Sequence, residues 1–223
     1  MTEPAPWTRI FNRIKTQIPA APDAVIKQEI WSTMDDFTAD TNVWVEEVPL
    51  AVTPDVTTYN INPLLHSGYP SRLLLVWNDL TNDPRDRYHW ATGGITMRVP
   101  GILQFVDVPT TAASWVAAVA KTPSEERVVL AVPPATTPTR TGYPEIDDWI
   151  VNSNSDAIYY GTMNFLQRQP SKPYGNEKAA RENGLIYQSA KSTARVNAMR
   201  GNVYGGQAWR FPQTFATQRK GWV

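Results

Sequence analysis

Side chains suited to catalysis are few and widely spaced in this sequence. The only histidines are His66 and His89, and the chain contains no cysteine. A thiol nucleophile, a disulfide framework, a thiolate zinc site and an iron–sulfur cluster are therefore excluded. The histidines show no metal-ligand spacing, and the Gly-Gly segment over 91–96 lacks the helix that must follow a phosphate-binding loop. We expect a hairpin turn at that segment, and we expect neither a metal nor a cofactor.

Pairs of adjacent carboxylates are the remaining candidates for acid–base chemistry. They are Asp35 with Asp36, Glu46 with Glu47, and Asp147 with Asp148. Glycoside hydrolysis needs two carboxyl groups that face each other across a cleft. Neighbours along a helix or strand point in different directions, so these pairs are poor candidates. The sequence therefore predicts no catalytic residue and favours a protein that is not an enzyme.

Helical periodicity marks both ends of the chain. A first helix is predicted over 6–18 and a second from Asp23, with an inner stripe of Ile26, Ile30, Thr33, Phe37 and Thr41. After a Pro/Thr-rich connector, one long helix is predicted from Pro144 to Gln169. A last helix, over 177–201, begins after the capping residue Asn176. Its inner stripe is made largely of small residues that favour close packing in a core: Ala180, Gly184, Tyr187, Ala190 or Lys191, Ala194 and Ala198.

Short alternating apolar runs between these helices predict about six or seven strands. The runs "VWVEEVPLAV" and "TTYNI" flank the turn "TPD" and predict a hairpin. We therefore expect an α+β protein: an antiparallel bundle of two N-terminal helices (1–42) and two C-terminal helices (139–200). The bundle would carry an inserted antiparallel sheet or sandwich over 43–138 and an extended arm over 201–223. Phe37 and Trp44 are predicted to lie at the joint, where Trp44 acts as a hinge anchor rather than a ligand platform.

Charge is distributed unevenly along the chain, although the net charge is +0. Residues 1–167 contain 11 basic and 19 acidic residues, whereas residues 168–223 contain 10 basic and 2 acidic ones. Such a dipolar chain suits contact with two different partners, although a basic tail could also serve only solubility. Basic residues spread around the last helix could meet nucleic-acid phosphates or an acidic protein rim: Lys178, Arg181, Lys191, Arg195 and Arg200.

The segment after Gly201 is aromatic and basic. Its aromatic residues are Tyr204, Trp209, Phe211, Phe215 and Trp222, and its basic residues are Arg210, Arg219 and Lys220. Disordered tails are usually poor in aromatic residues, so this one either wraps its own domain or docks on a partner, which we favour. No sequence-reading nucleic-acid motif is found. Nor is there an apolar run long enough for a signal peptide or a membrane span, so we expect a soluble, unprocessed chain.

Three segments carry a resemblance to a known family. "PDAVIKQEIWSTMDDFTADTNVWVEEVPLAV" leads from a helix through Phe, Thr and Trp into an x-E-E-x-P strand start. "VTTYNI" is similar to a returning strand, and "NFLQRQPSKPYGNEKAA" contains a Gln-Pro-x-Lys-Pro-aromatic turn between two helices. Together with the order of elements up to about residue 200, these segments resemble the head-to-tail adaptor, or connector, proteins of tailed bacteriophages, of the tail tubular protein A type.

The resemblance implies a structural virion protein at the head-tail junction. It implies a ring, typically dodecameric, that binds the capsid portal on one side and a distal tail or nozzle protein on the other, with double-stranded genome DNA in its channel. Under this interpretation the aromatic arm docks on the portal and the basic helix residues line a channel or rim. The alternatives are a module that binds tail fibres or a receptor through its β region, a tail-associated cell-wall hydrolase, and a scaffold unrelated to phages.

Overall fold

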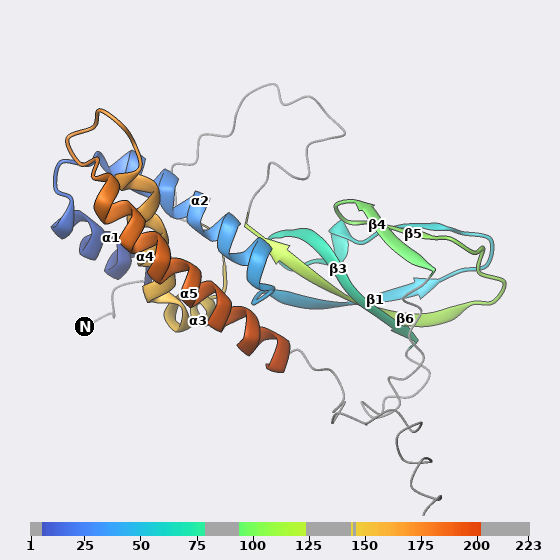
Figure 1. The fold of residues 1–223 in the computed structure, drawn as a ribbon. Coiled ribbons are helices and arrows are strands. Elements are labelled where there is room, and N and C mark those ends of the chain that lie inside the picture. Colours follow the sequence, from blue (N-terminus) through green and yellow to red (C-terminus); the bar gives the residue numbers. More distant parts are fainter. Residues whose placement is uncertain (1–5, 79–93, 124–143, 145, 202–223) are drawn as a thin grey trace, which may run out of the picture.

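The computed structural model describes residues 6–78, 94–123, 144 and 146–201. Helices gather at one end of the molecule and strands at the other, as Figure 1 shows. The described residues form five α-helices and two small antiparallel sheets. The α+β class expected from the sequence is confirmed.

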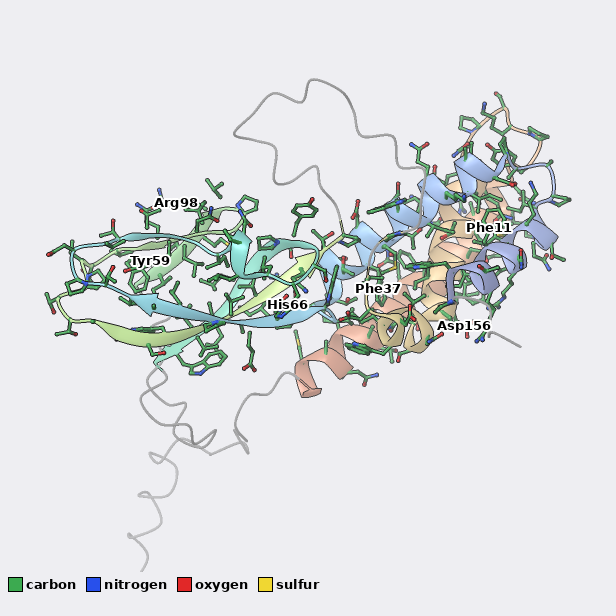
Figure 2. All side chains as sticks on the ribbon, turned by 180° about the vertical axis from the view of Figure 1, so that it is seen from behind. Phe11, Phe37, Tyr59, His66, Arg98 and Asp156 are labelled. Carbon is green, nitrogen blue, oxygen red and sulfur yellow. The ribbon has the colours of Figure 1, made fainter. Side chains whose placement is uncertain are left out.

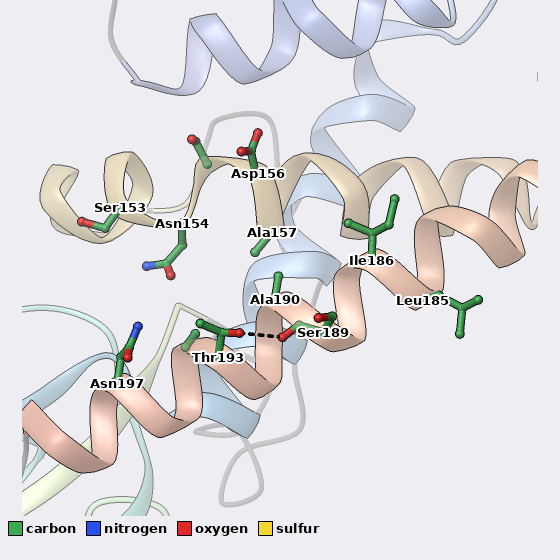
Figure 3. Close-up of a pocket in the computed structure, with 12 residues that line it drawn as sticks. Ser153, Asn154, Asp156, Ala157, Leu185, Ile186, Ser189, Ala190, Thr193 and Asn197 are labelled. Atoms are coloured by element: carbon green, nitrogen blue, oxygen red, sulfur yellow. Dashed lines mark hydrogen bonds between the residues drawn. The ribbon is translucent and has the colours of Figure 1, made fainter.

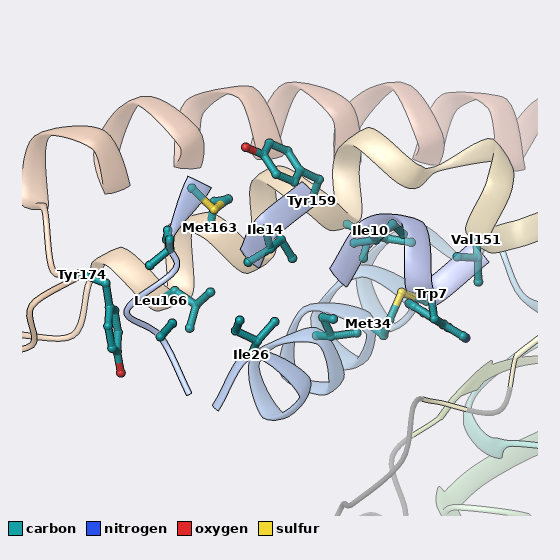
Figure 4. Close-up of a cluster of buried hydrophobic side chains, with 14 residues drawn as sticks. Trp7, Ile10, Ile14, Ile26, Met34, Val151, Tyr159, Met163, Leu166 and Tyr174 are labelled. Carbon is teal, nitrogen blue, oxygen red and sulfur yellow. The ribbon is translucent and has the colours of Figure 1, made fainter. Parts of the chain in front are cut away.

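The helical part consists of α1 (Pro6–Gln17), α2 (Asp23–Thr41), α3 (Asp148–Ser153), α4 (Ser155–Gln167) and α5 (Glu177–Gly201). Helices from both ends of the chain share one apolar cluster, which includes Ile14, Ile26, Ile30, Ile158 and Leu166, all fully buried (Figure 4). The predicted inner stripe of α2 is buried at each of its five positions. Asn176 caps α5 as expected, because its side-chain oxygen accepts a hydrogen bond from the backbone N–H of Ala179 at 3.1 Å.

The single long helix predicted from Pro144 is wrong in two respects. The first helical turn begins at Asp148, and Asn154 (φ −120°, ψ 21°) then separates α3 from α4. The Asn154 side-chain amide donates to the Ile150 carbonyl at 2.8 Å. Serine and asparagine compete with helical backbone hydrogen bonds in this way, and residues 153–155 are Ser-Asn-Ser. Among the described residues, three helices, rather than the two predicted, therefore follow the strands.

The strands are β1 (Val45–Val52), β2 (Thr58–Asn60), β3 (Tyr69–Asn78), β4 (Ile95–Val99), β5 (Ile102–Phe105) and β6 (Ala113–Thr122), with a 3₁₀ turn at Asn62–Leu64. One sheet has the order β1-β6-β3 and the other β2-β5-β4. Both sheets contribute to one apolar cluster, which includes Val48 of β1, Val119 of β6 and Leu103 of β5. This β part is therefore a small two-layer sandwich.

The predicted hairpin between the first two strands is wrong. The turn itself exists, with Asp55 in the left-handed region at φ 63°, but β1 pairs with β6 and β2 pairs with β5. The alternating pattern that buries Val48, Leu50 and Val52 is satisfied equally well by a partner distant in sequence. The run at 127–133, counted among the expected strands, lies outside the described residues, as do residues 91–93 of the turn expected over 91–96.

Candidate interaction site

The chain passes from the helical part to the β part at Trp44, which is 2% exposed. The Lys121 ammonium lies 4.3 Å from the centre of the Trp44 ring. Gly68, at φ +71°, packs against the same ring, and a Cβ at that position would overlap Cη2 of Trp44. Phe37, fully buried, lies instead in a cluster with Tyr187 and other residues of α4 and α5 (Figure 2). The structure therefore places Trp44 against the strands and Phe37 against the helices.

Polar contacts fix the start of β1 against its neighbours and join β6 to α2. Glu46 of β1 accepts from the Lys121 ammonium of β6 at 2.6 Å and from the backbone N–H of His66 at 3.1 Å, and Nδ1 of His66 contacts the same carboxylate. Burial opposes ionisation of Glu46, but these hydrogen bonds prevail and lower its pKa. Thr122 of β6 donates to Asp35 of α2 at 3.2 Å. Strand and helix are therefore joined by polar contacts as well as by the tryptophan.

A second polar cluster attaches α5 to α2. The Lys191 ammonium lies 2.9 Å from an oxygen of Asp36 and 2.5 Å from an oxygen of Asp40. Tyr187 donates its hydroxyl to Asp36 at 2.8 Å. The hydrogen bond from Lys191 lowers the pKa of Asp40, whereas burial, helped by the nearby Asp36, raises that of Tyr187. Asp35 and Asp36 thus face different partners, as expected for neighbours on a helix.

Burial corrects one of the predicted basic rim residues. The Lys191 side chain is 5% exposed and paired with two carboxylates, so it cannot present its charge to DNA or to a protein rim. Lys178 and Arg181 are exposed in the first turns of α5. The Arg195 guanidinium lies 3.7 Å from a carboxylate oxygen of Asp40. Arg200 lies in the last turn of α5. All eight arm residues proposed to dock on the portal lie outside the described residues.

The outward face of α5 carries no exposed charge over residues 183–194. Four large apolar side chains are exposed on this helix: Leu185 (70%), Ile186 (44%), Val196 (45%) and Met199 (59%). Between Asn183 and Ala194 the only charged residue is Lys191, which is buried. A helix face that meets only water usually carries charged residues, so this face has the character of a contact surface.

A groove of about 620 Å³ runs beside this face. One wall is formed by residues 153–157, where α3 gives way to α4, and the other by residues of α5 from Leu185 to Asn197. Figure 3 shows Ala157 and Ala190 facing each other across it. Because these side chains are small, they leave the space between the two walls unfilled. We call the groove and the exposed apolar residues of α5 the α5 surface.

The α5 surface can be recognised in the sequence by a feature other than the helical period of apolar residues. The predicted inner stripe is found, because Ala180, Tyr187 and Ala194 are buried. Small and apolar residues also continue around the helix to the opposite face, in a stretch without exposed charge. Absence of exposed charge along three turns of a predicted helix is the pattern that indicates a second contact face.

The described residues contain no group of three side chains arranged to hold a metal ion. None of the helices described is both long enough and apolar enough to cross a bilayer. No protein-family model matches the chain, and no curated protein matches its sequence.

Proposed function

We propose that this chain is a head-to-tail adaptor subunit of a tailed bacteriophage. The observation that carries the proposal is that helices from both ends of the chain share one core, with the strands inserted between them. This is the order of elements that the adaptor resemblance implies. In this proposal α1 and α2, together with α4 and α5, form the two-plus-two antiparallel bundle of an adaptor.

Two of the segments that carry the resemblance also have structural roles, which supports the proposal. In the turn between α4 and α5, Tyr174 donates its hydroxyl to the Gln169 side chain at 2.9 Å, and Gln169 donates to Glu29 of α2 at 2.9 Å. In the other segment, Lys121 of β6 contacts both Trp44 and Glu46, where the chain leaves α2 and enters β1. Both motifs therefore fix neighbouring elements in position relative to one another. An adaptor subunit held between two assemblies needs such a rigid arrangement.

The proposed assembly is a ring, dodecameric in the form implied by the resemblance, at the head-tail junction of the virion. The portal protein would bind the aromatic arm over 201–223, and a distal tail or nozzle protein would bind the opposite side. Tail fibres would be a further partner. Genome DNA would pass through the channel, near exposed basic residues such as Lys178 and Arg181, by contact with its phosphates.

Portal binding tests this function directly. We expect the full-length chain to co-sediment with rings of the portal protein from the same phage, and a variant lacking residues 202–223 to lose most of that binding. A matched variant, Lys178→Gln/Arg181→Gln, should retain portal binding, because these side chains are assigned to the channel. Undiminished binding by the truncated chain would overturn the assignment of the arm, and absence of binding by the intact chain would overturn the adaptor function.

A fibre- or receptor-binding module is the second candidate, and one observation favours it. A recess of about 310 Å³ in the β part is lined by Phe105, Trp115 and Val108. Val106 and Val108 are 66% and 53% exposed beside it. Binding of a fibre protein that is abolished by Val106→Asp/Val108→Asp, together with absence of portal binding, would select this function over the adaptor.

A further inference from the structure

The α5 surface lies at the end of the helix from which an aromatic segment continues. Residues 202–223 form a segment of 22 residues with five aromatic and three basic side chains and no acidic one. An isolated segment of this length cannot bury its aromatic rings against itself. The α5 surface, in turn, exposes Leu185, Met199 and other apolar side chains next to a groove. Each of these two surfaces could cover the other.

Chain length and direction permit this contact within one subunit. Asn197, which lines the groove, lies about one helical turn before Gly201 at the end of α5. From Gly201 back to Leu185 the distance along the helix is about 24 Å, at a rise of ~1.5 Å per residue. The 22 residues from 202 to 223 span roughly 70 Å when fully extended. The segment can therefore turn back at Gly201 and follow the whole groove with length to spare.

Charge also favours the contact. Asp156 is the only carboxylate among the residues that line the groove, and it forms an ion pair with Arg13 at 2.6 Å. Two more exposed carboxylates, Asp147 and Asp148, lie a few residues before this wall, at the start of α3. The segment carries Arg210, Arg219 and Lys220 and no opposing charge. Tethering gives the segment an effective concentration on the order of millimolar at its own subunit, above that of a second copy in dilute solution.

We infer that the α5 surface is the docking site of this chain's own residues 202–223 in the free subunit. The aromatic side chains of the segment cover the exposed apolar residues of α5, and its basic side chains lie near the carboxylates at the start of α3 and α4. The inference goes beyond the adaptor function and does not rest on it. In an adaptor, it would mean that the portal must displace the arm from the α5 surface before binding it.

Photo-crosslinking of the full chain tests the docking. Because the chain has no cysteine, Ser189→Cys places a single thiol in the groove for a benzophenone maleimide label. Gln28→Cys, at an exposed position on α2, is the matched control. Irradiation of equal amounts of ¹⁵N-labelled and unlabelled protein, followed by mass spectrometry of the peptides, identifies the crosslinked segment and shows whether it comes from the same chain.

We expect the label at position 189 to crosslink to residues 202–223 of the same chain, at least about tenfold more than the label at position 28. Adding Leu185→Asp should reduce that yield severalfold. Leu185 is 70% exposed, so this change leaves the helical core intact. Equal yields from the two label positions would overturn the inference. So would crosslinks mainly between isotopically different chains, because a second copy would then occupy the surface. No portal is present, so the result is independent of the adaptor proposal.

Discussion

The polar cluster between α5 and α2 predicts an asymmetric response to mutation. The Lys191 side chain is 5% exposed, whereas those of Asp36 and Asp40 are 41% and 49% exposed. Replacing both aspartates with asparagine leaves a buried ammonium without a counter-charge. Replacing Lys191 with methionine leaves two carboxylates that water can reach. The two changes remove the same ion pairs, but they leave very different groups behind.

Burial sets the size of each effect. Removing the partners of a buried charge costs about 3–5 kcal/mol. We expect Asp36→Asn/Asp40→Asn to lower the free energy of unfolding by about 3 kcal/mol, since the amide oxygens still accept hydrogen bonds. Lys191→Met keeps the apolar stem packed and should cost only about 1 kcal/mol. The triple variant should lie close to Lys191→Met, because it contains no buried charge.

Urea unfolding at pH 7, followed by far-ultraviolet circular dichroism, measures these differences. With a slope of about 2 kcal/mol per molar urea, the midpoint should fall by about 1.5 M in the double aspartate variant and by about 0.5 M in Lys191→Met. Coincident transitions by tryptophan fluorescence would validate the two-state treatment. If Lys191→Met proved as destabilising as the double variant, the reasoning from burial would be refuted.

Three further predictions concern the joint, the helix packing and pH. Trp44→Ala should cost about 3–5 kcal/mol in urea unfolding, whereas Trp149→Ala, at a side chain 59% exposed, should cost less than about 0.5 kcal/mol; similar costs would contradict the role of Trp44 as an anchor. Gly161→Ala should destabilise by about 1–3 kcal/mol, because its Cβ would lie 2.5 Å from a threonine methyl group of α2. Gly184→Ala should leave the free energy of unfolding within about 0.5 kcal/mol of that of the unmodified protein, because the better helix propensity of alanine offsets a 3.0 Å contact with one amide oxygen. A larger loss from Gly184→Ala than from Gly161→Ala would contradict the packing. Because Lys191 lowers the pKa of Asp40, their pairing should stabilise the fold above about pH 4 and be lost as pH falls through the lowered pKa. Thermal unfolding should therefore detect a larger loss from Asp40→Asn at pH 7 than at pH 2, and an equal loss at both values would exclude this linkage.

The sequence predicted the helical elements best where one face alone is buried. In α2, the period of Ile26, Ile30 and Phe37 is a local property, and all three side chains are buried as expected. The break at Asn154 was missed because the apolar pattern continues on both sides of it. The local signal was the Ser-Asn-Ser run, whose side chains hydrogen-bond to the backbone and weaken a helix.

Strand partners could not be predicted in the same way. A turn after Val52 shows where the chain reverses but does not show whether the next strand joins the same sheet. The pairing of β1 with β6 joins Val45 to Ala120, across a separation that no local pattern encodes. Lys191 was misassigned for a related reason. Its charge indicates a solvated face unless the distant Asp36 and Asp40 are known to lie opposite it.

Imaging of the assembly tests the central claim most directly. The chain should be examined by negative-stain electron microscopy, alone and after mixing with portal rings from the same phage. The adaptor function predicts closed rings with a central channel, either free or stacked on one face of the portal. A monodisperse monomer that leaves the portal rings unchanged would contradict it.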